Sequence, residues 1–319
     1  MKKIGLALQG GGSHGAFTWG VLDRLLELDD LEFSSVCGTS AGAINAVVMT
    51  YGLHKGGKKM AKDLLDKLWY EISQSGKVFL DHRYFDFVNK FVSPYQFNPF
   101  NLNPLKPIIS NLVNFDELNK SNLKLFVCAT NVKTNRAKIF KTDNMSVNSI
   151  LASCCLPHIF QAVKIDDEYY WDGGYMANPP LSPLFENIDI TDILLVKINS
   201  INIENLPKTI NEINDRVTEI SFNSSLMNEM RIIHLRNQFI KKGLDLGEWG
   251  NKEIFVHSIS GYDILSKLEY STKMNVNYSF LLKLKEEGRN YADKWIKEEY
   301  HNVGKKSSFD VEKHFFNKF

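Results

Sequence analysis

The hydrophobic positions of the chain fall into two kinds of segment that alternate along the sequence. Short apolar runs with polar boundaries are typical of strands buried on both faces, and they lie at 2–8, 33–37, 123–132, 169–171, 191–198 and 253–259. Apolar residues at helical spacing lie between them, at about 16–28, 41–49, 53–73, 146–155, 208–241 and 273–300. The strand–helix–strand–helix opening predicts a parallel sheet covered by helices, and therefore an α/β fold. Residues 137–141 are expected to pair with the strand at 123–132.

The long helical segment 208–241 carries apolar residues at a spacing that predicts one buried face. These residues are Ile210, Ile213, Val217, Ile220, Met227 and Met230. Because side chains three or four positions apart share one face of a helix, we expect them to pack into the core.

Residues 77–112 differ from the rest of the chain. They combine many Phe and Tyr residues with Asn, and four prolines fall between Pro94 and Pro107. Prolines at this density disfavour long regular elements. One interpretation is a lid or a pocket for an acyl chain, and the other is a loop-rich cap that packs on the core.

The segment between the second strand and its following helix has the form G-x-S-x-G, with Gly38, Ser40 and Gly42 at the fixed positions. A strand that turns sharply into a helix holds the middle residue on a strained elbow with its side chain exposed. The helix N-terminus then favours negative charge near the hydroxyl group. Ser40 is therefore a candidate nucleophile, and the alternative is a plain turn in which the serine caps the helix.

A glycine-rich loop follows the first strand and allows two interpretations. Gly10, Gly12 and Gly15 satisfy the dinucleotide-binding pattern G-x-G-x-x-G, with Asp29 and Asp30 downstream. In that motif, however, the acidic residue lies at the end of the second strand, whereas both aspartates precede it here. The other interpretation is an oxyanion hole, in which Gly10, Gly11 and Gly12 present backbone N–H groups beside Ser40.

Asp172 lies at the end of the aromatic strand 169–171 and precedes Gly173 and Gly174. Functional side chains of parallel α/β sheets collect where strands end, so Asp172 is a candidate base for Ser40. The alternative is that Asp-Gly-Gly forms only a tight turn.

The eight histidines are weaker candidates for a base. His14 and His158 are possible bases in loops, and the role of His257, within a late strand, is open. The remaining histidines lie in polar or amphipathic context and are expected at the surface: His54, His82, His234, His301 and His314.

The composition limits the classes of partner and compartment. The net charge of +1 gives no indication of nucleic-acid binding. Four cysteines, at 37, 128, 154 and 155, lie in apolar runs without C-x-x-C spacing, so we expect buried free thiols in a reducing compartment and no metal site. The apolar stretch after Lys2 and Lys3 is too short for a signal peptide, and no run approaches the length of a membrane span. A cytoplasmic location is expected.

Three motifs in order resemble the patatin-like phospholipases, in particular their bacterial branch. These motifs are Gly10-Gly11-Gly12-Ser13-His14-Gly15, Gly38-Thr39-Ser40-Ala41-Gly42 and Asp172-Gly173-Gly174. The resemblance covers roughly residues 4–198. One departure is His14, which stands where the family usually has Arg or Lys.

The resemblance implies an α/β/α sandwich with a mostly parallel central sheet and extra C-terminal helices. It implies a Ser–Asp dyad of Ser40 and Asp172, without histidine, metal or cofactor, and an oxyanion loop of Gly10 to Gly12. The expected activity is hydrolysis of acyl esters in lipids, with transient contact to a membrane surface. The competing hypotheses are a nucleotide-binding oxidoreductase and a non-catalytic lipid-binding protein.

The resemblance also suggests how the chain is divided. Residues 1–200 are expected to form the catalytic domain. Residues 201–319 are expected to form a mainly helical extension that packs on it and does not fold independently.

Overall fold

The strands of this chain pair into one mixed sheet, and most of them run parallel. A computed structural model describes residues 1–79, 92–185, 190–203, 206–247, 250, 252–268 and 270–316. Across these ranges the strands are β1 (Lys2–Leu8), β2 (Leu31–Gly38), β3 (Lys124–Asn131), β4 (Arg136–Lys141), β5 (Val163–Ile165), β6 (Glu168–Asp172), β7 (Asp192–Lys197) and β8 (Phe255–Ser260). Their order is β5-β6-β3-β2-β1-β7-β8, and β4 pairs with β3.

Strand direction changes at β3. Neighbouring strands from β3 through β2, β1 and β7 to β8 are parallel, whereas β4, β5 and β6 join by antiparallel pairs. The apolar runs therefore predicted the parallel part correctly, and the expected pairing of 137–141 with 123–132 is confirmed.

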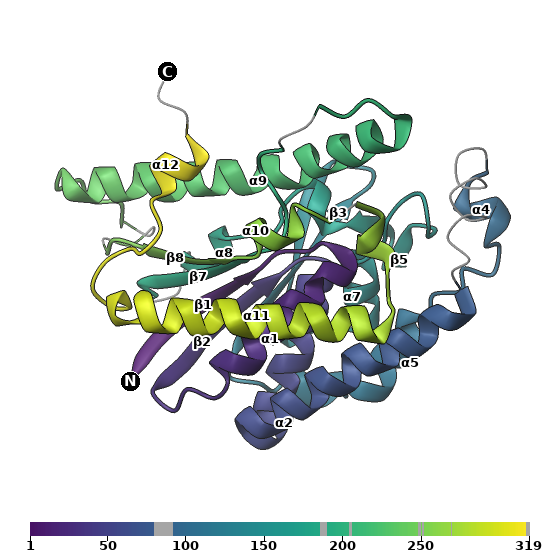
Figure 1. Ribbon diagram of the computed structural model, residues 1–319, viewed down its shortest axis with the longest axis horizontal. Helices are drawn as coiled ribbons and strands as arrows, with labels where there is room; N and C mark the ends of the chain where they lie inside the picture. Colours follow the sequence, from purple (N-terminus) through teal and green to yellow (C-terminus); the bar gives the residue numbers. More distant parts are fainter. Residues whose placement is uncertain are drawn as a thin grey trace.

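Helices cover both faces of the sheet (Figure 1). On one face lie α1 (Gly15–Leu25), α2 (Ala41–Phe79) and α11 (Tyr278–Glu298), and on the other lie α9 (Ile210–Lys241) and α12 (Val311–Phe315). Successive side chains of β1 point to opposite faces of the sheet, which explains the two helical layers. Leu6 and Leu8 belong to the core beneath α1, and Ala7 belongs to the core beneath α9. The result is the predicted α/β/α sandwich.

Shorter helices complete the edges of the sandwich. They are α4 (Pro94–Phe97), α5 (Leu105–Leu112), α6 (Phe115–Leu118), α7 (Val147–Ser153), α8 (Ser182–Phe185) and α10 (Tyr262–Leu265). The proline-rich part of 77–112 thus forms the short helices α4 and α5, with Pro107 in the first turn of α5, where proline is tolerated. The aromatic residues at 80–91 lie outside the described residues.

The N-terminal half of α9 contradicts the expectation drawn from its spacing. Ile210, Ile213, Val217 and Ile220 are 61%, 42%, 61% and 54% exposed. The expectation is confirmed further along the helix, where Met230 is buried and Met227 packs partly buried against the core. The buried face there consists of Phe222, Leu226, Met230 and Ile233. Spacing alone identifies residues that share a face of a helix, but it does not say whether that face meets the core.

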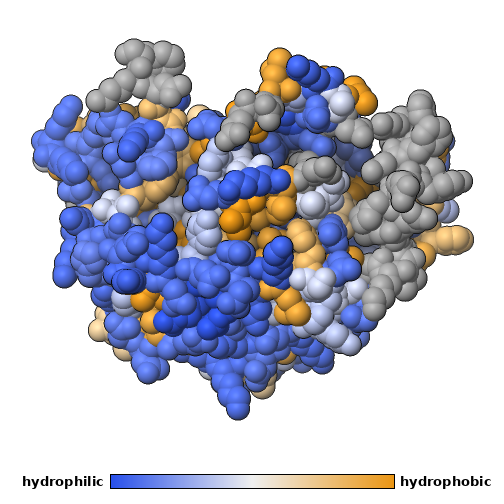
Figure 2. Space-filling model, viewed as in Figure 1, coloured by the Kyte–Doolittle hydropathy of each residue, from blue (hydrophilic) through white to orange (hydrophobic). Residues whose placement is uncertain are grey.

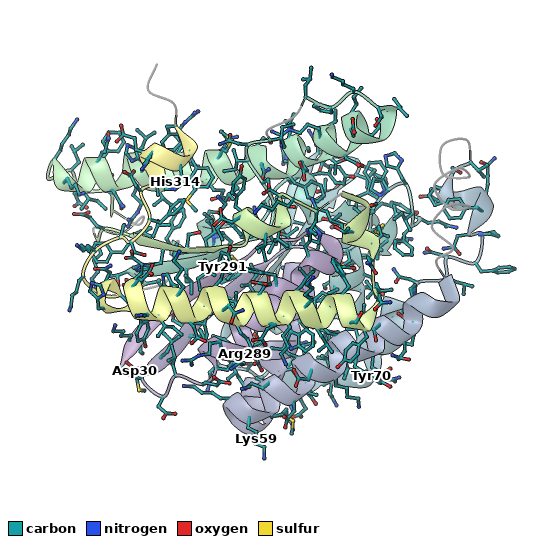
Figure 3. All side chains as sticks on the ribbon, viewed as in Figure 1. Asp30, Lys59, Tyr70, Arg289, Tyr291 and His314 are labelled. Atoms are coloured by element: carbon teal, nitrogen blue, oxygen red, sulfur yellow. The ribbon has the colours of Figure 1, made fainter. Side chains whose placement is uncertain are left out.

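The last third of the chain contributes to the same sheet and the same core. β8 pairs with β7, and α11 packs on α1 with Gly288 against the backbone of Phe17. Arg289 of α11 also bonds to Asp23 and Glu27 at the C-terminal part of α1 and just beyond it (Figure 3). Residues 201–319 are therefore more than a helical layer added to a finished domain.

Candidate active site

Ser40 lies on a strained turn between β2 and α2. Its φ angle is 55°, a left-handed conformation that is uncommon for a residue with a Cβ atom. The turn also passes close to β1, because a Cβ on Gly42 would lie 2.1 Å from the carbonyl oxygen of Leu8. This geometry is that of a nucleophile elbow.

Two hydroxyl groups hold the elbow in place. The Ser40 backbone N–H donates to Oγ of Ser153 at 3.0 Å, and Oγ of Thr39 donates to the carbonyl oxygen of Ala177 at 2.7 Å. Ser153 is the last residue of α7, so this helix fixes the turn from the side. The strained conformation of Ser40 is thus supported by hydrogen bonds from outside the elbow.

Asp172 is the last residue of β6, the strand that pairs antiparallel with β3. Sheet register brings it near the elbow, because Gly38 pairs with Val127 and Asp172 pairs with Ala129, two residues further along β3. Its Oδ1 accepts the N–H of Gly174 at 2.8 Å, which orients the carboxyl group. The Asp-Gly-Gly turn therefore fixes the direction of this side chain.

The carboxyl group of Asp172 is fully buried. Burial raises its pKa to about 7, against smaller lowering effects of the Gly174 N–H and the Ser40 hydroxyl. Its Oδ2 has no hydrogen-bond partner within the described ranges, and the Ser40 hydroxyl is close enough to lower the pKa of this carboxyl group. A buried oxygen without a partner is costly, and it is free to accept a proton.

The glycine loop lies directly against the elbow. A Cβ on Gly10 would be 2.7 Å from Cβ of Ser40. The N–H of Gly10 donates to Oδ1 of Asn178 at 2.6 Å, and its carbonyl oxygen accepts from Nδ2 of Asn199 at 2.6 Å. The N–H groups of Gly11 and Gly12 have no acceptor among the described residues. These two groups, rather than that of Gly10, are available as donors.

A distant segment closes over this loop. The carbonyl oxygen of Lys273, in the 3₁₀ turn η5 (Tyr270–Met274), would lie 2.3 Å from a Cβ on Gly12, whose φ is +59°. The Lys273 ammonium donates to Oδ1 of Asn199 at 3.0 Å and to Oε1 of Glu219 on α9 at 3.2 Å. η5 therefore ties the glycine loop to α9.

His14 is buried in this contact and does not act as a cation. Its Nε2 shares a 2.8 Å hydrogen bond with Oγ1 of Thr272 in η5. Burial, with a smaller effect of the Lys273 ammonium, lowers the pKa of His14 to about 3, so the imidazole is neutral. His14 thus supports the loop through η5, and it does not supply the positive charge of the Arg or Lys usual in the family that the motifs resemble.

Two further histidines bear on the choice of base, and His82 lies outside the described residues. His158 is exposed. His257 bonds to Asp192 and Ser308 at 2.9 Å each. Asp192 is the first residue of β7, whereas Ser40 follows the last residue of β2. Because these strands run parallel, the buried network of His257 lies at the opposite end of the strands from Ser40.

An apolar cavity of about 340 Å³ opens at Ser40. Gly12 and Ser13 of the glycine loop also line it, whereas Asp172 does not. Most of the wall is hydrophobic: Ile44, Trp69, Ile72, Phe97, Leu102, Leu105, Leu156, Ile159, Phe160, Met274 and Val276. Part of segment 77–112 therefore forms the pocket wall, and the volume lies within the range of small-molecule sites.

The dinucleotide interpretation fails on geometry. Asp30 precedes β2, and its side chain accepts from the hydroxyl of Tyr300 (Figure 3). The end of β2, where the motif requires an acidic residue, carries the Ser40 elbow instead.

Comparison with known proteins identifies the family. The family model described as patatin-like phospholipase matches residues 6–185. The chain belongs to the patatin-like phospholipase family. The three motifs predicted this family from sequence, and the observed sheet is that of a patatin-like α/β fold.

Similar proteins come from a virus and a fungus. An uncharacterized protein of Acanthamoeba polyphaga mimivirus is 24% identical over 201 residues, which are 58% of this chain and 63% of that protein. The lysophospholipase NTE1 of Cryptococcus neoformans is 27% identical over 205 residues, which are 63% of this chain and 11% of that enzyme. The chain thus spans less than two thirds of either relative.

Two solved structures are similar to this patatin-like chain at low sequence identity. VipD from Legionella pneumophila has a TM-score of 0.43 and 14% identity, over 93% of this chain and 67% of VipD. The ExoU–SpcU complex from the type III secretion system of Pseudomonas aeruginosa has a TM-score of 0.40 and 16% identity, over 98% of this chain and 57% of the matched chain.

The patatin motifs did not reveal every residue that holds the site. Ser153, Asn199 and Lys273 contact the elbow or the glycine loop, yet none belongs to a recognisable motif. Their partners lie far along the chain, so no local sequence signal could have found them. Within the described ranges, no group of three His, Cys, Asp or Glu residues is arranged to hold a metal ion, and the four cysteines are buried free thiols.

Proposed function

We propose that this chain is a lipid acyl hydrolase that cleaves carboxylic ester bonds through a dyad of Ser40 and Asp172. One observation carries the proposal. A strained serine opens into an apolar cavity beside a buried carboxyl group whose pKa is about 7 and whose Oδ2 has no partner among the described residues. In an aspartate with a purely structural role, a buried carboxylate oxygen is normally hydrogen-bonded.

The proposed reaction uses only groups of this chain. Oγ of Ser40 attacks the ester carbonyl carbon while Oδ2 of Asp172 takes the hydroxyl proton. The N–H groups of Gly11 and Gly12 stabilise the oxyanion. The leaving alcohol takes the proton from Asp172. The same carboxylate then takes a proton from a water molecule that attacks the acyl carbon, and it returns this proton to Oγ of Ser40 as the fatty acid leaves.

The proposed substrate is an ester of a fatty acid, of the phospholipase A or lipase type. Support comes from the hydrophobic wall of the cavity, which suits an acyl chain, and from membership in a family described by its phospholipase activity. Assignment to the bacterial branch and to the cytoplasm remain predictions from the sequence.

Transient contact with a membrane surface belongs to the same proposal. In the part of the chain that the structure describes, no helix is both long enough and apolar enough to span a bilayer. The exposed stripe of Ile210, Ile213, Val217 and Ile220 flanks Glu219, which bonds to the cavity-lining Lys273. In Figure 2, a few apolar side chains lie among polar ones over this end of α9, and each residue of the stripe is more than 40% exposed. An exposed apolar patch beside a lipid pocket suits a bilayer surface.

A covalent probe tests the nucleophile. A fluorophosphonate ester should form one adduct with the wild-type protein, detected by intact-protein mass spectrometry, because a hydroxyl activated by a base attacks phosphorus. Ser40→Ala should show no adduct and no hydrolysis of acyl esters, while Ser153→Ala, which keeps the nucleophile, should still be labelled.

Other outcomes separate the competing hypotheses. Labelling that survives Ser40→Ala would remove Ser40 as nucleophile. A folded wild-type protein that neither reacts with the probe nor hydrolyses any ester would instead be a lipid-binding protein on this fold.

A further inference from the structure

Lys273 extends a largely buried ammonium group toward the glycine loop from the other end of the chain. Its side chain is 11% exposed, and Nζ donates to Oε1 of Glu219 at 3.2 Å and to Oδ1 of Asn199 at 3.0 Å. A cation at this depth needs a counter-charge, and Glu219 provides it. Nζ is therefore held between α9 and the side chain of Asn199.

Asn199 lies two residues beyond β7 and is 4% exposed. Its side-chain amide fits between two partners, the Lys273 ammonium and the carbonyl oxygen of Gly10, to which Nδ2 donates at 2.6 Å. An ammonium group only donates hydrogen bonds, and a carbonyl oxygen only accepts them. One orientation of the amide therefore satisfies both partners, and the ammonium selects it by facing Oδ1.

The carbonyl group of Gly10 belongs to the same peptide unit as the N–H of Gly11. This unit is planar and trans, so its C=O and N–H point in opposite directions and turn together. Nδ2 of Asn178 also donates to the Gly10 oxygen, but at 3.3 Å, so the Asn199 contact is the shorter of the two. Holding the Gly10 oxygen thus fixes the direction in which the Gly11 N–H points.

We infer that Lys273 is a positioning residue that aims the Gly11 N–H at the oxyanion, acting through the side-chain amide of Asn199. This inference rests on the proposed function, in which Gly11 is one of the oxyanion donors. The hydrogen bonds on the Gly10 oxygen also polarise the shared peptide unit, which makes its N–H a stronger donor. A charge from the last third of the chain therefore controls a donor near its beginning.

Substitution of Lys273 tests the role of the charge. Lys273→Met keeps the aliphatic stem, and Glu219 keeps Arg216 as a partner at 3.3 Å. For the soluble ester p-nitrophenyl butyrate, kcat should fall about 10–100-fold, because a loosely held donor loses part of the roughly 10²–10³-fold contribution of an oxyanion contact. KM should change little, since the oxyanion develops only toward the transition state. Lys273→Arg, which keeps a cation that only donates, should retain most of kcat.

Asn199→Asp distinguishes this relay from a simple tether between η5 and the loop. The aspartate still accepts from Lys273, but neither of its oxygens can donate to Gly10. The relay predicts that kcat falls as in Lys273→Met, whereas a tether predicts unchanged kcat. Once Asn199→Ala has removed the amide, adding Lys273→Met should cause no further loss, because both changes break the same path. Full kcat in Asn199→Asp, or losses that multiply in the double variant, would overturn the inference.

A matched control removes an ion pair of the same length elsewhere on α9. Lys241 pairs with Glu253 at 3.2 Å at the C-terminal end of this helix, whereas Glu219 lies in its N-terminal half. Lys241→Met should keep the kcat of the wild type on the same ester. Equal losses in the two lysine variants, or no loss in Lys273→Met, would contradict the assignment.

The Gly11 amide resonance separates this inference from the proposed function. The protein is labelled with ¹⁵N-glycine, and the Gly11 peak is assigned by its absence in Gly11→Ala. Lys273→Met and Asn199→Asp should each shift that peak, and Lys241→Met should not. If the wild type hydrolyses no ester while these shifts occur, the proposed hydrolase fails and Lys273 still positions the Gly11 N–H. An unshifted Gly11 peak in folded Lys273→Met protein overturns the inference, whatever the activity.

Discussion

Asp172 combines two properties that are unfavourable for a purely structural residue. Its carboxyl group is fully buried, and one of its two oxygens has no partner among the described residues. The other oxygen is held by the Gly174 N–H, so the free oxygen has a fixed direction. Because burial raises the pKa of Asp172 to about 7, this carboxylate is a far better proton acceptor at neutral pH than a solvated aspartate.

The pH dependence of ester hydrolysis follows from that pKa. The base must be deprotonated, so kcat/KM should fall about 10-fold for each pH unit below about 7 and level off above it. Asp172→Asn should lower kcat by about 10²–10⁴-fold, the contribution of a positioned base. Initial rates on a soluble ester between about pH 5 and pH 9 measure both effects, with circular dichroism to check folding.

His14→Gln is the matched control for a histidine mechanism. The His14 imidazole is neutral and bonded to Thr272, so this variant should keep substantial activity with the same acid limb. An active Asp172→Asn protein together with a dead His14→Gln or His158→Gln protein would instead show a histidine-dependent hydrolase.

The two residues of the proposed dyad could be selected as candidates from the sequence because each follows a local rule. Ser40 lies between two glycines at a strand-to-helix turn, and Asp172 lies on a glycine turn after an aromatic strand. Ser153 was not predictable, since a serine inside a short apolar helix has no distinguishing neighbours. Its role depends on where α7 packs, which is a property of the tertiary fold.

The glycine loop and η5 act as one unit at the scale of elements. η5 contacts the loop at Gly12, at His14 and, through Asn199, at the carbonyl oxygen of Gly10. The direction of the Gly11 and Gly12 N–H groups therefore depends on a turn from the other end of the chain. From the sequence the loop itself was predictable, but this contact was not.

Gly12→Ala tests whether the loop is an oxyanion hole. The added Cβ would meet the Lys273 carbonyl oxygen at 2.3 Å in a backbone of φ +59°, so the loop must move. We expect kcat to fall by about 10²–10³-fold, the loss seen when one oxyanion donor is displaced. The assay is ester turnover by a variant shown to be folded.

Gly243→Ala serves as the control for backbone strain alone. Gly243 also has a positive φ, of +76°, but a Cβ there would meet no atom within 4 Å. This variant should lose some stability and keep full kcat. If Gly12→Ala also keeps full kcat, the loop has a role other than that of an oxyanion hole.

α9 illustrates why element-level patterns were only partly informative. Its existence and bounds were predicted closely, as were the strands other than the three-residue β5, because long periodic segments are the strongest local signal. The spacing also gave the stripe of Ile210, Ile213, Val217 and Ile220, yet it assigned that stripe to the core. Two apolar faces compete on this helix, and only the position of the sheet decides which one is buried.

At the scale of the whole molecule, this exposed stripe should direct the protein to lipid surfaces. Val217→Ser/Ile220→Ser should lower binding to phospholipid vesicles, and hydrolysis of their lipids, by about 30-fold or more, because burying the two side chains in the bilayer interface contributes on the order of 2–4 kcal/mol together. Turnover of a monomeric ester should not change. Vesicle sedimentation and the two assays measure this difference.

The C-terminal half of the same helix provides the matched control. Ile232 and Leu235 are 46% and 43% exposed, but they lie several turns away from Glu219 and the cavity. Ile232→Ser/Leu235→Ser should bind vesicles as the wild type does. Equal losses in both variants would mean that the exposed residues of α9 serve folding or self-association, with no preferred membrane face.

The contact between Gly12 and Lys273 also sets when the site can be completed during synthesis of the chain. The two halves of the site are separated by most of the chain, and ribosomes add about 5–20 residues per second. Roughly 15–50 seconds therefore pass between the synthesis of the glycine loop and that of the turn that closes over it. During this interval the Ser40 elbow can form, but neither the finished cavity wall nor the fixed loop exists. If the proposed function holds, a nascent chain is expected to hydrolyse no acyl ester until residues 270–274 have been made.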